Sequence, residues 1–219
     1  MKKTFNAIAA TVGITLFASC AAFKSPESWD PAFYDTHRNL TSGEVDMAKT
    51  IFADSLEYDK IHIQTENFPR RSKAYWGKIR LNKYHYHDDI SNAPLNDRKT
   101  FIHELAHIWQ ESARGVNLVS SAAGLFIRNA GYGSEIYDYG NIKDVKDFDG
   151  LNIEQQASII EDFYENSEKI AHRRGNLELY GRDGRCETQK QQLRVLQPHL
   201  SHLDQSVGCK ALDGASLTA

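Results

Sequence analysis

Apolar residues recur at helical spacing in several stretches of the chain and alternate with polar residues in one stretch of its first half. Thr41 and Glu44 have the spacing of a capping box, in which each side chain accepts a hydrogen bond from the other residue's backbone N–H, so a helix is expected to begin there. Residues 61–63 predict a short strand, and residues 74–83 predict a longer one because every second position is apolar or small. A small sheet is therefore expected early in the chain.

Helices dominate the rest of the sequence. One is expected over about 97–114, where a glycine follows as a stop, another over 152–173, capped by its first residue, and a last one over 187–197. The small and apolar residues 117–127 suit either a buried helix or an apolar loop. Residues 131–150, rich in Gly, Tyr and Asp, are expected to be irregular and exposed. Together these elements predict an α+β, helix-rich fold.

The first 20 residues have the pattern of a bacterial export signal. Lys2 and Lys3 precede an apolar run that ends in small residues around Cys20 and is too short to span a bilayer as a helix. The small residues favour lipoprotein processing with lipidation of Cys20, although Phe17 stands where such signals usually carry Leu. An ordinary cleaved signal and an uncleaved anchor are the alternatives. We expect an exported protein, periplasmic or lipid-anchored to the cell-envelope membrane.

The chain holds three cysteines and is mildly acidic. Disulfides persist in exported proteins, so Cys186 and Cys209 are expected to form a disulfide that pins the C-terminal tail; two unrelated thiols are the alternative. The net charge of −3 becomes −5 without residues 1–19, which hold two lysines and no other charge. An acidic total argues against general nucleic-acid binding, and 41% hydrophobic residues argue against wholesale disorder.

The candidate chemistry lies in His103-Glu104-Leu105-Ala106-His107. Residues four apart share one face of a helix, so His103 and His107 can both bind one Zn²⁺ ion, at about 2.0–2.1 Å each. Glu104 lies one position further around the helix, where it can face a water on the same metal and take its proton as that water attacks a carbonyl. The alternative is a pair of surface histidines beside a solvated glutamate, which the apolar opposite face of this helix disfavours.

A catalytic zinc site usually has three protein ligands and one open position. The next histidine after His107 is His172, so the third ligand is expected to be a carboxylate on a later helix. Glu154 is the first choice, because it lies in the first turn of a capped helix and the small Ala157 would let that helix pack closely. Helix-start electrostatics alone would also favour an acid at this position. The rival carboxylates are Glu135, Glu161 and Asp162.

These residues resemble the zincin metallopeptidases of the Glu-ligand type, the gluzincins. A longer pattern, over roughly residues 40–166, is similar to small bacterial Rhs- or Vgr-related proteins associated with secretion systems. It consists of Leu40-Thr41-x-Gly43-Glu44, Gly77-x-Ile79, His103-Glu104-x-x-His107-x-Trp109-Gln110, Tyr137-x-Tyr139 and Glu154-Gln155-Gln156-Ala157-x-Ile159-Ile160-x-Asp162. Gluzincins often place an Asp four residues after the ligand Glu. This chain has Ser158 there, so Glu161, Asp162 or water is expected to orient the first histidine.

The resemblance implies a zincin-like fold with a small early sheet, the HExxH helix and a second ligand helix. It implies His103, His107 and Glu154 as Zn²⁺ ligands, Glu104 as the general base, and an association with a secretion system. The expected organisation is an export signal (1–19), a tether (20–39), a zincin-like metal-binding domain (40–175) and a C-terminal helical tail (176–219).

An oxyanion formed by attack of water needs a hydrogen-bond donor besides the metal. Tyr137 and Tyr139 lie between the two ligand helices in sequence and are the first candidates for this catalytic role, with packing on a loop surface as the alternative for each. His172 is a further candidate, ranked behind them.

Residues 67–87 hold six Lys and Arg residues and no acid. We favour a solvated strand face; a surface for acidic peptide, lipid phosphate or cell-wall polymer is the alternative. A sheet edge here could also hold an extended substrate by strand addition. His85 and His87 form a His-x-His pair that could bind a second metal, but an exposed pair beside Asp88 and Asp89 is favoured.

Two hypotheses from different classes follow. The first is an exported zinc-dependent hydrolase, namely a metallopeptidase acting on a peptide or protein substrate, or a variant of it acting on a peptidoglycan cross-link. The second is a non-catalytic envelope lipoprotein that binds a partner, with zinc as a structural clip or an ancestral remnant. An open coordination position beside an accessible cleft would favour the enzyme. A fourth protein ligand, or a cleft filled by residues 117–140, would favour the binding protein.

Overall fold

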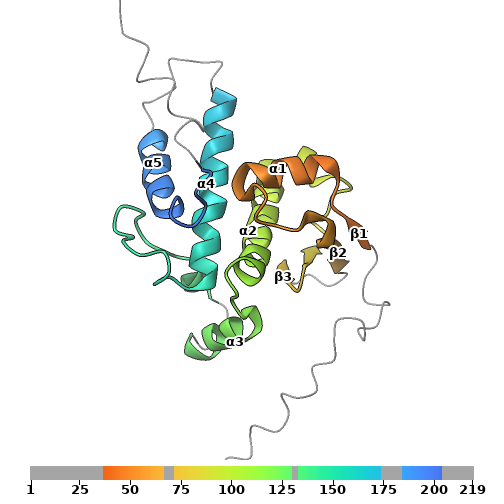
Figure 1. The fold of residues 1–219 in the computed structure, drawn as a ribbon, viewed down its shortest axis with the longest axis horizontal. Helices are drawn as coiled ribbons and strands as arrows, with labels where there is room; N and C mark the ends of the chain where they lie inside the picture. The colour runs from red at the N-terminus through yellow and green to blue at the C-terminus, as the bar shows by residue number, and fades with distance from the viewer. Residues whose placement is uncertain (1–36, 67–71, 130–132, 174–183, 204–219) are drawn as a thin grey trace, which may run out of the picture. The chain divides into compact units, whose positions relative to one another are not determined.

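The computed structural model describes residues 37–66, 72–129, 133–173 and 184–203. The main elements are β1 (His37–Asn39), α1 (Ser42–Phe52), β2 (His62–Glu66), β3 (Lys73–Tyr75), β4 (Lys78–Asn82), α2 (Leu95–Ser112), α3 (Leu118–Arg128), α4 (Ile153–Arg173) and α5 (Arg185–Leu196) (Figure 1). The prediction of an α+β, helix-rich fold with a small early sheet is confirmed. Within these ranges, no helix is long and apolar enough to cross a membrane.

Local capping starts two of the helices where the sequence predicts. At α1, the Thr41 hydroxyl accepts from the backbone N–H of Glu44 at 3.1 Å, and the Glu44 carboxylate accepts from that of Thr41 at 2.9 Å. At α4, the Asn152 side chain accepts from the backbone N–H of Gln155 at 3.0 Å, and the Gln155 side chain accepts from that of Asn152 at 3.1 Å. Because these interactions are local, the sequence alone could locate both helix starts.

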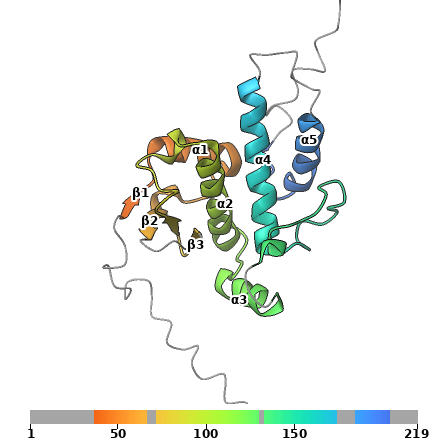
Figure 2. The same cartoon turned by 180° about the vertical axis from the view of Figure 1, so that it is seen from behind.

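The four strands form one sheet in the order β1-β2-β4-β3. β2 and β4 run parallel, and β1 and β3 are antiparallel to their neighbours. Among the described strands, β3 therefore lies at an edge of the sheet. The sheet and α1 lie on one side of α2, while α4 and α5 lie on the other (Figures 1 and 2). This arrangement buries ten consecutive residues of α2, Phe101 to Gln110, so the HExxH segment lies inside the molecule.

The prediction of one continuous strand over 74–83 is wrong. Trp76 and Gly77 have φ values of 51° and 69°, and Tyr75 pairs with Lys78 across them, so the segment folds into a tight hairpin of β3 and β4. Positive φ at both central residues is the geometry of a type I′ turn. Contacts from distant residues hold the turn: the Glu111 carboxylate of α2 accepts from the backbone N–H of Trp76 at 2.5 Å. The local pattern of alternation gives no sign of such a contact.

The segments between α2 and α4 also differ from expectation. Residues 118–128 form a helix, one of the two predicted alternatives, but only Leu118 and Leu125 of it are buried, while the residue Ile127 is 78% exposed. The segment 131–150 is largely irregular as predicted in its described part. It is not uniformly exposed, because Ile142 and Phe148 are buried in the main core.

Several predictions concern residues that the structure does not describe. The export signal, Cys20 and Cys209 lie outside the described ranges. Cys186, in the first turn of α5, is disulfide-bonded, and its partner is not among the described residues. The pairing of Cys186 with Cys209 therefore stays a prediction.

Candidate metal centre

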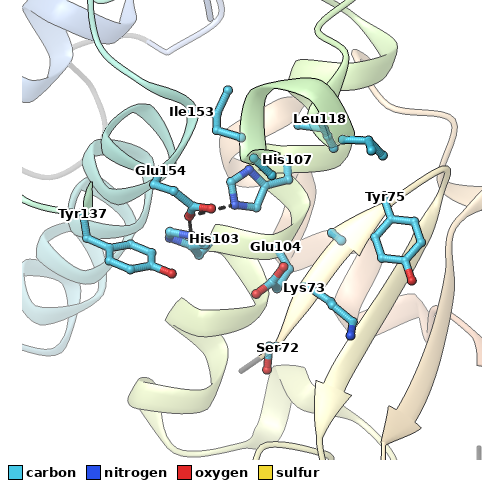
Figure 3. Close-up of a pocket in the computed structure, with 13 residues that line it drawn as sticks. Ser72, Lys73, Tyr75, His103, Glu104, His107, Leu118, Tyr137, Ile153 and Glu154 are labelled. Carbon is cyan, nitrogen blue, oxygen red and sulfur yellow. Dashed lines mark hydrogen bonds and ion pairs between the residues drawn. The ribbon is translucent and has the colours of Figure 1, made fainter. Parts of the chain in front are cut away.

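His103 and His107 of α2 meet Glu154 of α4 in a buried group (Figure 3). The Nε2 atoms of His103 and His107 each lie 3.2 Å from Oε2 of Glu154. Among the residues described here, this is the one group of three or more His, Cys, Asp or Glu side chains placed to share a metal ion. The structure thus brings together the three side chains that the sequence predicted as ligands.

The separations of these atoms fit a bound metal ion. Two ligand atoms at about 2.0–2.1 Å from Zn²⁺, seen at a tetrahedral angle, lie about 3.3 Å apart. Both histidine-to-glutamate separations are 3.2 Å. Two imidazole nitrogens and a carboxylate oxygen are also a donor set that zinc takes in catalytic sites.

The other ring nitrogens of the two histidines contact acceptors outside the group. Nδ1 of His103 lies 3.0 Å from Oε2 of Glu161, and Nδ1 of His107 lies 2.9 Å from Oε1 of Gln110. An acceptor at Nδ1 places the proton there and leaves Nε2 free to bind a metal. Of the three predicted ways to orient the first histidine, the structure shows Glu161. No role was predicted for Gln110 from the sequence, although its spacing of three residues from His107 on one helix was a usable signal.

Glu104 is buried beside this group, and its Oε2 has no hydrogen-bond partner among the described residues. Burial raises the pKa of its carboxyl group to about 7, although the nearby His107 and His103 act to lower it. Burying a carboxylate oxygen without a hydrogen-bond partner lowers the free energy of unfolding. Its presence here indicates that the site is shaped for something other than stability.

Negative charge surrounds the two histidines. Burial lowers the pKa of His103, but hydrogen bonds to Glu154 and Glu161 outweigh it and raise that pKa to about 10. Burial likewise acts to raise the pKa of Glu154, yet its hydrogen bonds with His103 and His107 hold that pKa well below the usual range. Surroundings that hold a proton this firmly would also stabilise a divalent cation.

The group faces a cavity of about 480 Å³. β3 forms one wall and α3 another, the metal group and Glu104 lie between them, and most of the exposed lining surface is apolar (Figure 3). The lining residues outside the metal group are Ser72, Lys73, Ala74, Tyr75, Glu104, Leu118, Val119, Ala122, Tyr137 and Ile153.

The two candidate tyrosines lie in different surroundings. Tyr137 lines the cavity, and its ring centroid is 6.0 Å from that of His103. The hydroxyl of Tyr139 donates to Asp162 at 2.5 Å, and Tyr139 is not part of the cavity wall. Of the two, the structure brings only Tyr137 to the metal group, and a catalytic role for either stays a prediction.

The basic stretch and the His-x-His pair have structural partners. Arg80 is buried, and its Cζ atom lies over the ring of Tyr75, 4.8 Å from the ring centroid. The prediction of a solvated strand face is therefore wrong at this position. His85 and His87 each lie 2.7 Å from the carboxylate of Asp97, rather than standing exposed beside Asp88 and Asp89 as expected. They tie the loop after β4 to the start of α2.

The chain is similar in sequence to part of a bacterial secretion-system protein. Over 188 residues the chain is 28% identical to the type VI secretion system spike protein VgrG2b of Pseudomonas aeruginosa. The chain is homologous to part of VgrG2b. The match covers 83% of this chain but 18% of VgrG2b, so the chain spans less than a fifth of that protein's length. The solved effector domain of Pseudomonas aeruginosa VgrG2b aligns with a TM-score of 0.49 and 26% identity, over 66% of this chain and 83% of the solved chain. No family model matches the chain.

Proposed function

We propose that this chain is a zinc-dependent metallopeptidase in which Glu104 is the general base. The observation that carries the proposal is the buried Oε2 of Glu104, which has no hydrogen-bond partner in the described ranges and lies beside three side chains whose atoms have the separations of metal ligands. A bound Zn²⁺ would supply a Lewis acid for the substrate carbonyl and lower the pKa of a coordinated water.

The chain's own residues then have distinct roles. His103, His107 and Glu154 would hold the metal, with Glu161 and Gln110 orienting the two imidazoles. The Glu104 carboxylate takes the proton of the attacking water and returns it to the leaving amine.

Of the two tyrosines between the ligand helices, Tyr137 is the candidate donor to the developing oxyanion, because it lines the cavity and its ring lies beside that of His103.

The walls of the cavity support an extended peptide as the substrate. Among the described strands, β3 lies at an edge of the sheet and borders the cavity, and a strand at a sheet edge can pair with an extended peptide. On the other wall, Leu118, Val119 and Ala122 of α3 present apolar surface. These features suit a peptide that carries an apolar side chain near the bond to be cleaved.

The same geometry favours the enzyme over a non-catalytic partner-binding protein. The metal group has three ligand residues in the described part of the chain, which leaves room for a fourth, exchangeable position. α3 forms a wall of the cavity and does not fill it.

We propose that the chain is exported, with Cys20 as its lipid anchor to the envelope membrane and with a Cys186–Cys209 disulfide. The similarity to a type VI secretion spike protein supports an association with a secretion system.

Replacing Glu104 with glutamine tests the mechanism, because the amide keeps the shape of the side chain but cannot serve as a base. Glu104→Gln should retain the wild-type zinc content and lose cleavage of a quenched fluorescent peptide library by about 100-fold or more. Glu165→Gln, which changes a charge on α4 away from the cavity, is the control and should cleave normally. Cleavage at the wild-type rate by Glu104→Gln would overturn the mechanism. An absence of cleavage by the zinc-loaded wild type would favour the partner-binding alternative.

A further inference from the structure

Gln110 connects a metal-binding histidine of α2 to the beginning of α4. Its side chain is completely buried. Oε1 lies 2.9 Å from Nδ1 of His107, and Nε2 donates to the backbone carbonyl of Ile153 at 2.9 Å and to Oε1 of Gln156 at 3.0 Å. The first of these carbonyls belongs to the residue directly before Glu154. One amide therefore contacts a histidine of the metal group and the backbone that carries its glutamate.

The hydrogen-bond partners of Gln156 fix which way round its amide lies. Nε2 of Gln156 donates to the backbone carbonyls of Phe148 at 3.0 Å and Leu151 at 3.1 Å, and carbonyl oxygens only accept. Its Oε1 must therefore be the atom that faces Gln110. Arg114 agrees with this direction, because its guanidinium group has no acceptor atom and donates to the same Oε1 at 3.2 Å.

The orientation of Gln156 in turn fixes that of Gln110. Oε1 of Gln156 and the carbonyl of Ile153 both accept, so the NH₂ group of Gln110 must face them. Only its Oε1 remains for His107. That oxygen cannot donate, so Nδ1 of His107 must carry the proton, and Nε2 is the atom left to bind a metal.

We propose that Gln110 is a positioning residue with two roles. It sets the tautomer of His107, and it fixes the start of α4 in the position where Glu154 contacts Nε2 of His107. This inference rests on the metal site of the proposed function for its effect on zinc binding, but the tautomer of His107 follows from the amide chain itself. The acceptor at Nδ1 of His107 is the neutral amide of Gln110, whereas the acceptor at Nδ1 of His103 is the carboxylate of Glu161.

The test compares two buried glutamines in the same fold. Gln110→Met keeps the length of the side chain but removes its polar atoms, and should lower the Zn²⁺ affinity about 10–100-fold in competition with a chromophoric chelator. Gln189→Met removes the amide of a buried glutamine on α5 that donates to Ser167, and should leave Zn²⁺ affinity unchanged. If Gln110→Met binds zinc as tightly as wild type, the proposal is overturned.

A spectrum of the wild-type protein tests the tautomer without any variant and without metal. With ¹⁵N-labelled histidine, two-bond ¹H–¹⁵N correlations should show a proton on Nδ1 of His107. A bare Nδ1 with a protonated Nε2 would overturn the proposal even if zinc binds. A protonated Nδ1 in a protein that binds no zinc would support the role of Gln110 and count against the proposed metal site, so the two failures can be told apart.

Discussion

Nδ1 of His103 lies 3.0 Å from Oε2 of Glu161, which is seven residues after Glu154 on α4. Residues seven apart are two turns apart on nearly the same face of a helix, so both acids point towards α2. Glu154 lies at Nε2 of the same imidazole. One helix therefore supplies an acceptor for each ring nitrogen of His103, one proposed as a fellow metal ligand and the other as the group that orients the ring.

Glu161→Gln should lower the Zn²⁺ affinity by about tenfold, because the amide loses the charge that strengthens the imidazole as a ligand. Glu165→Gln is the matched control. Lys99 lies 3.3 Å from the carboxylate of Glu161 and 3.7 Å from that of Glu165, so each variant weakens an ion pair with the same lysine, but only Glu161 contacts His103. Equal affinities of the two variants, measured by chelator competition, would show that Glu161 does not act through His103.

Glu154→Ala should reduce the zinc content from one ion per chain to nearly none, because two histidines alone rarely hold zinc in proteins. Glu135→Ala removes a rival carboxylate that the structure leaves outside the metal group, and should retain zinc. Elemental analysis of the dialysed proteins provides the measurement. One zinc ion per chain in Glu154→Ala would mean that another group is the third ligand.

Asp97 should make the stability of the fold depend on pH in the acidic range. Burial acts to raise the pKa of Asp97, but hydrogen bonds from His85 and His87 outweigh it and the pKa is lowered. A carboxylate with a lowered pKa stabilises the fold fully above its unfolded pKa, near 4, and this contribution is lost as the pH falls through the folded pKa. Asp97→Asn should thus cost about 1–2 kcal/mol at neutral pH and less in acid.

Urea unfolding of wild type and Asp97→Asn between pH 7 and about pH 3 checks this dependence. Asp88→Asn, next to His87 in sequence, is the control and should show no such convergence with wild type. A constant difference between wild type and Asp97→Asn across the range would show that the contacts of Asp97 do not depend on its charge.

The local parts of this structure were predictable and the parts set by distant contacts were not. Capping boxes at Thr41 and Asn152 fixed two helix starts, and the four-residue spacing of His103 and His107 fixed their common face. The meeting of Glu154 with the two histidines could be predicted because a carboxylate near the start of a capped helix has a defined position. The buried amide chain of Gln110 and Gln156 could not, since its partners are backbone carbonyls brought together only by packing.

The exposure of α3 and the position of Tyr139 likewise could not be predicted from local sequence. An apolar segment is usually buried, but in α3 the residues Val119 and Ile127 are 43% and 78% exposed. Tyr139 follows Tyr137 by two residues, yet its hydroxyl meets Asp162 on α4. The order of residues in a loop does not specify which of two similar side chains reaches a site.

The hairpin that the sequence pattern missed yields the last prediction, through two glycines with nearly equal φ values. Gly77 and Gly115 have φ values of +69° and +67°, but a Cβ atom at Gly77 would lie 2.9 Å from the carbonyl oxygen of Lys60, whereas one at Gly115 would meet nothing within 4 Å.

Alanine in this conformation costs about 1 kcal/mol at either position, and at Gly77 the backbone near Lys60 must also move. We expect Gly115→Ala to lower the free energy of unfolding by about 1 kcal/mol and Gly77→Ala by at least about 2 kcal/mol. Urea unfolding measures both, and equal losses would show that the turn has room for a side chain. Because this turn leads out of the strand that borders the cavity, Gly77→Ala should also weaken peptide cleavage, while Gly115→Ala should not.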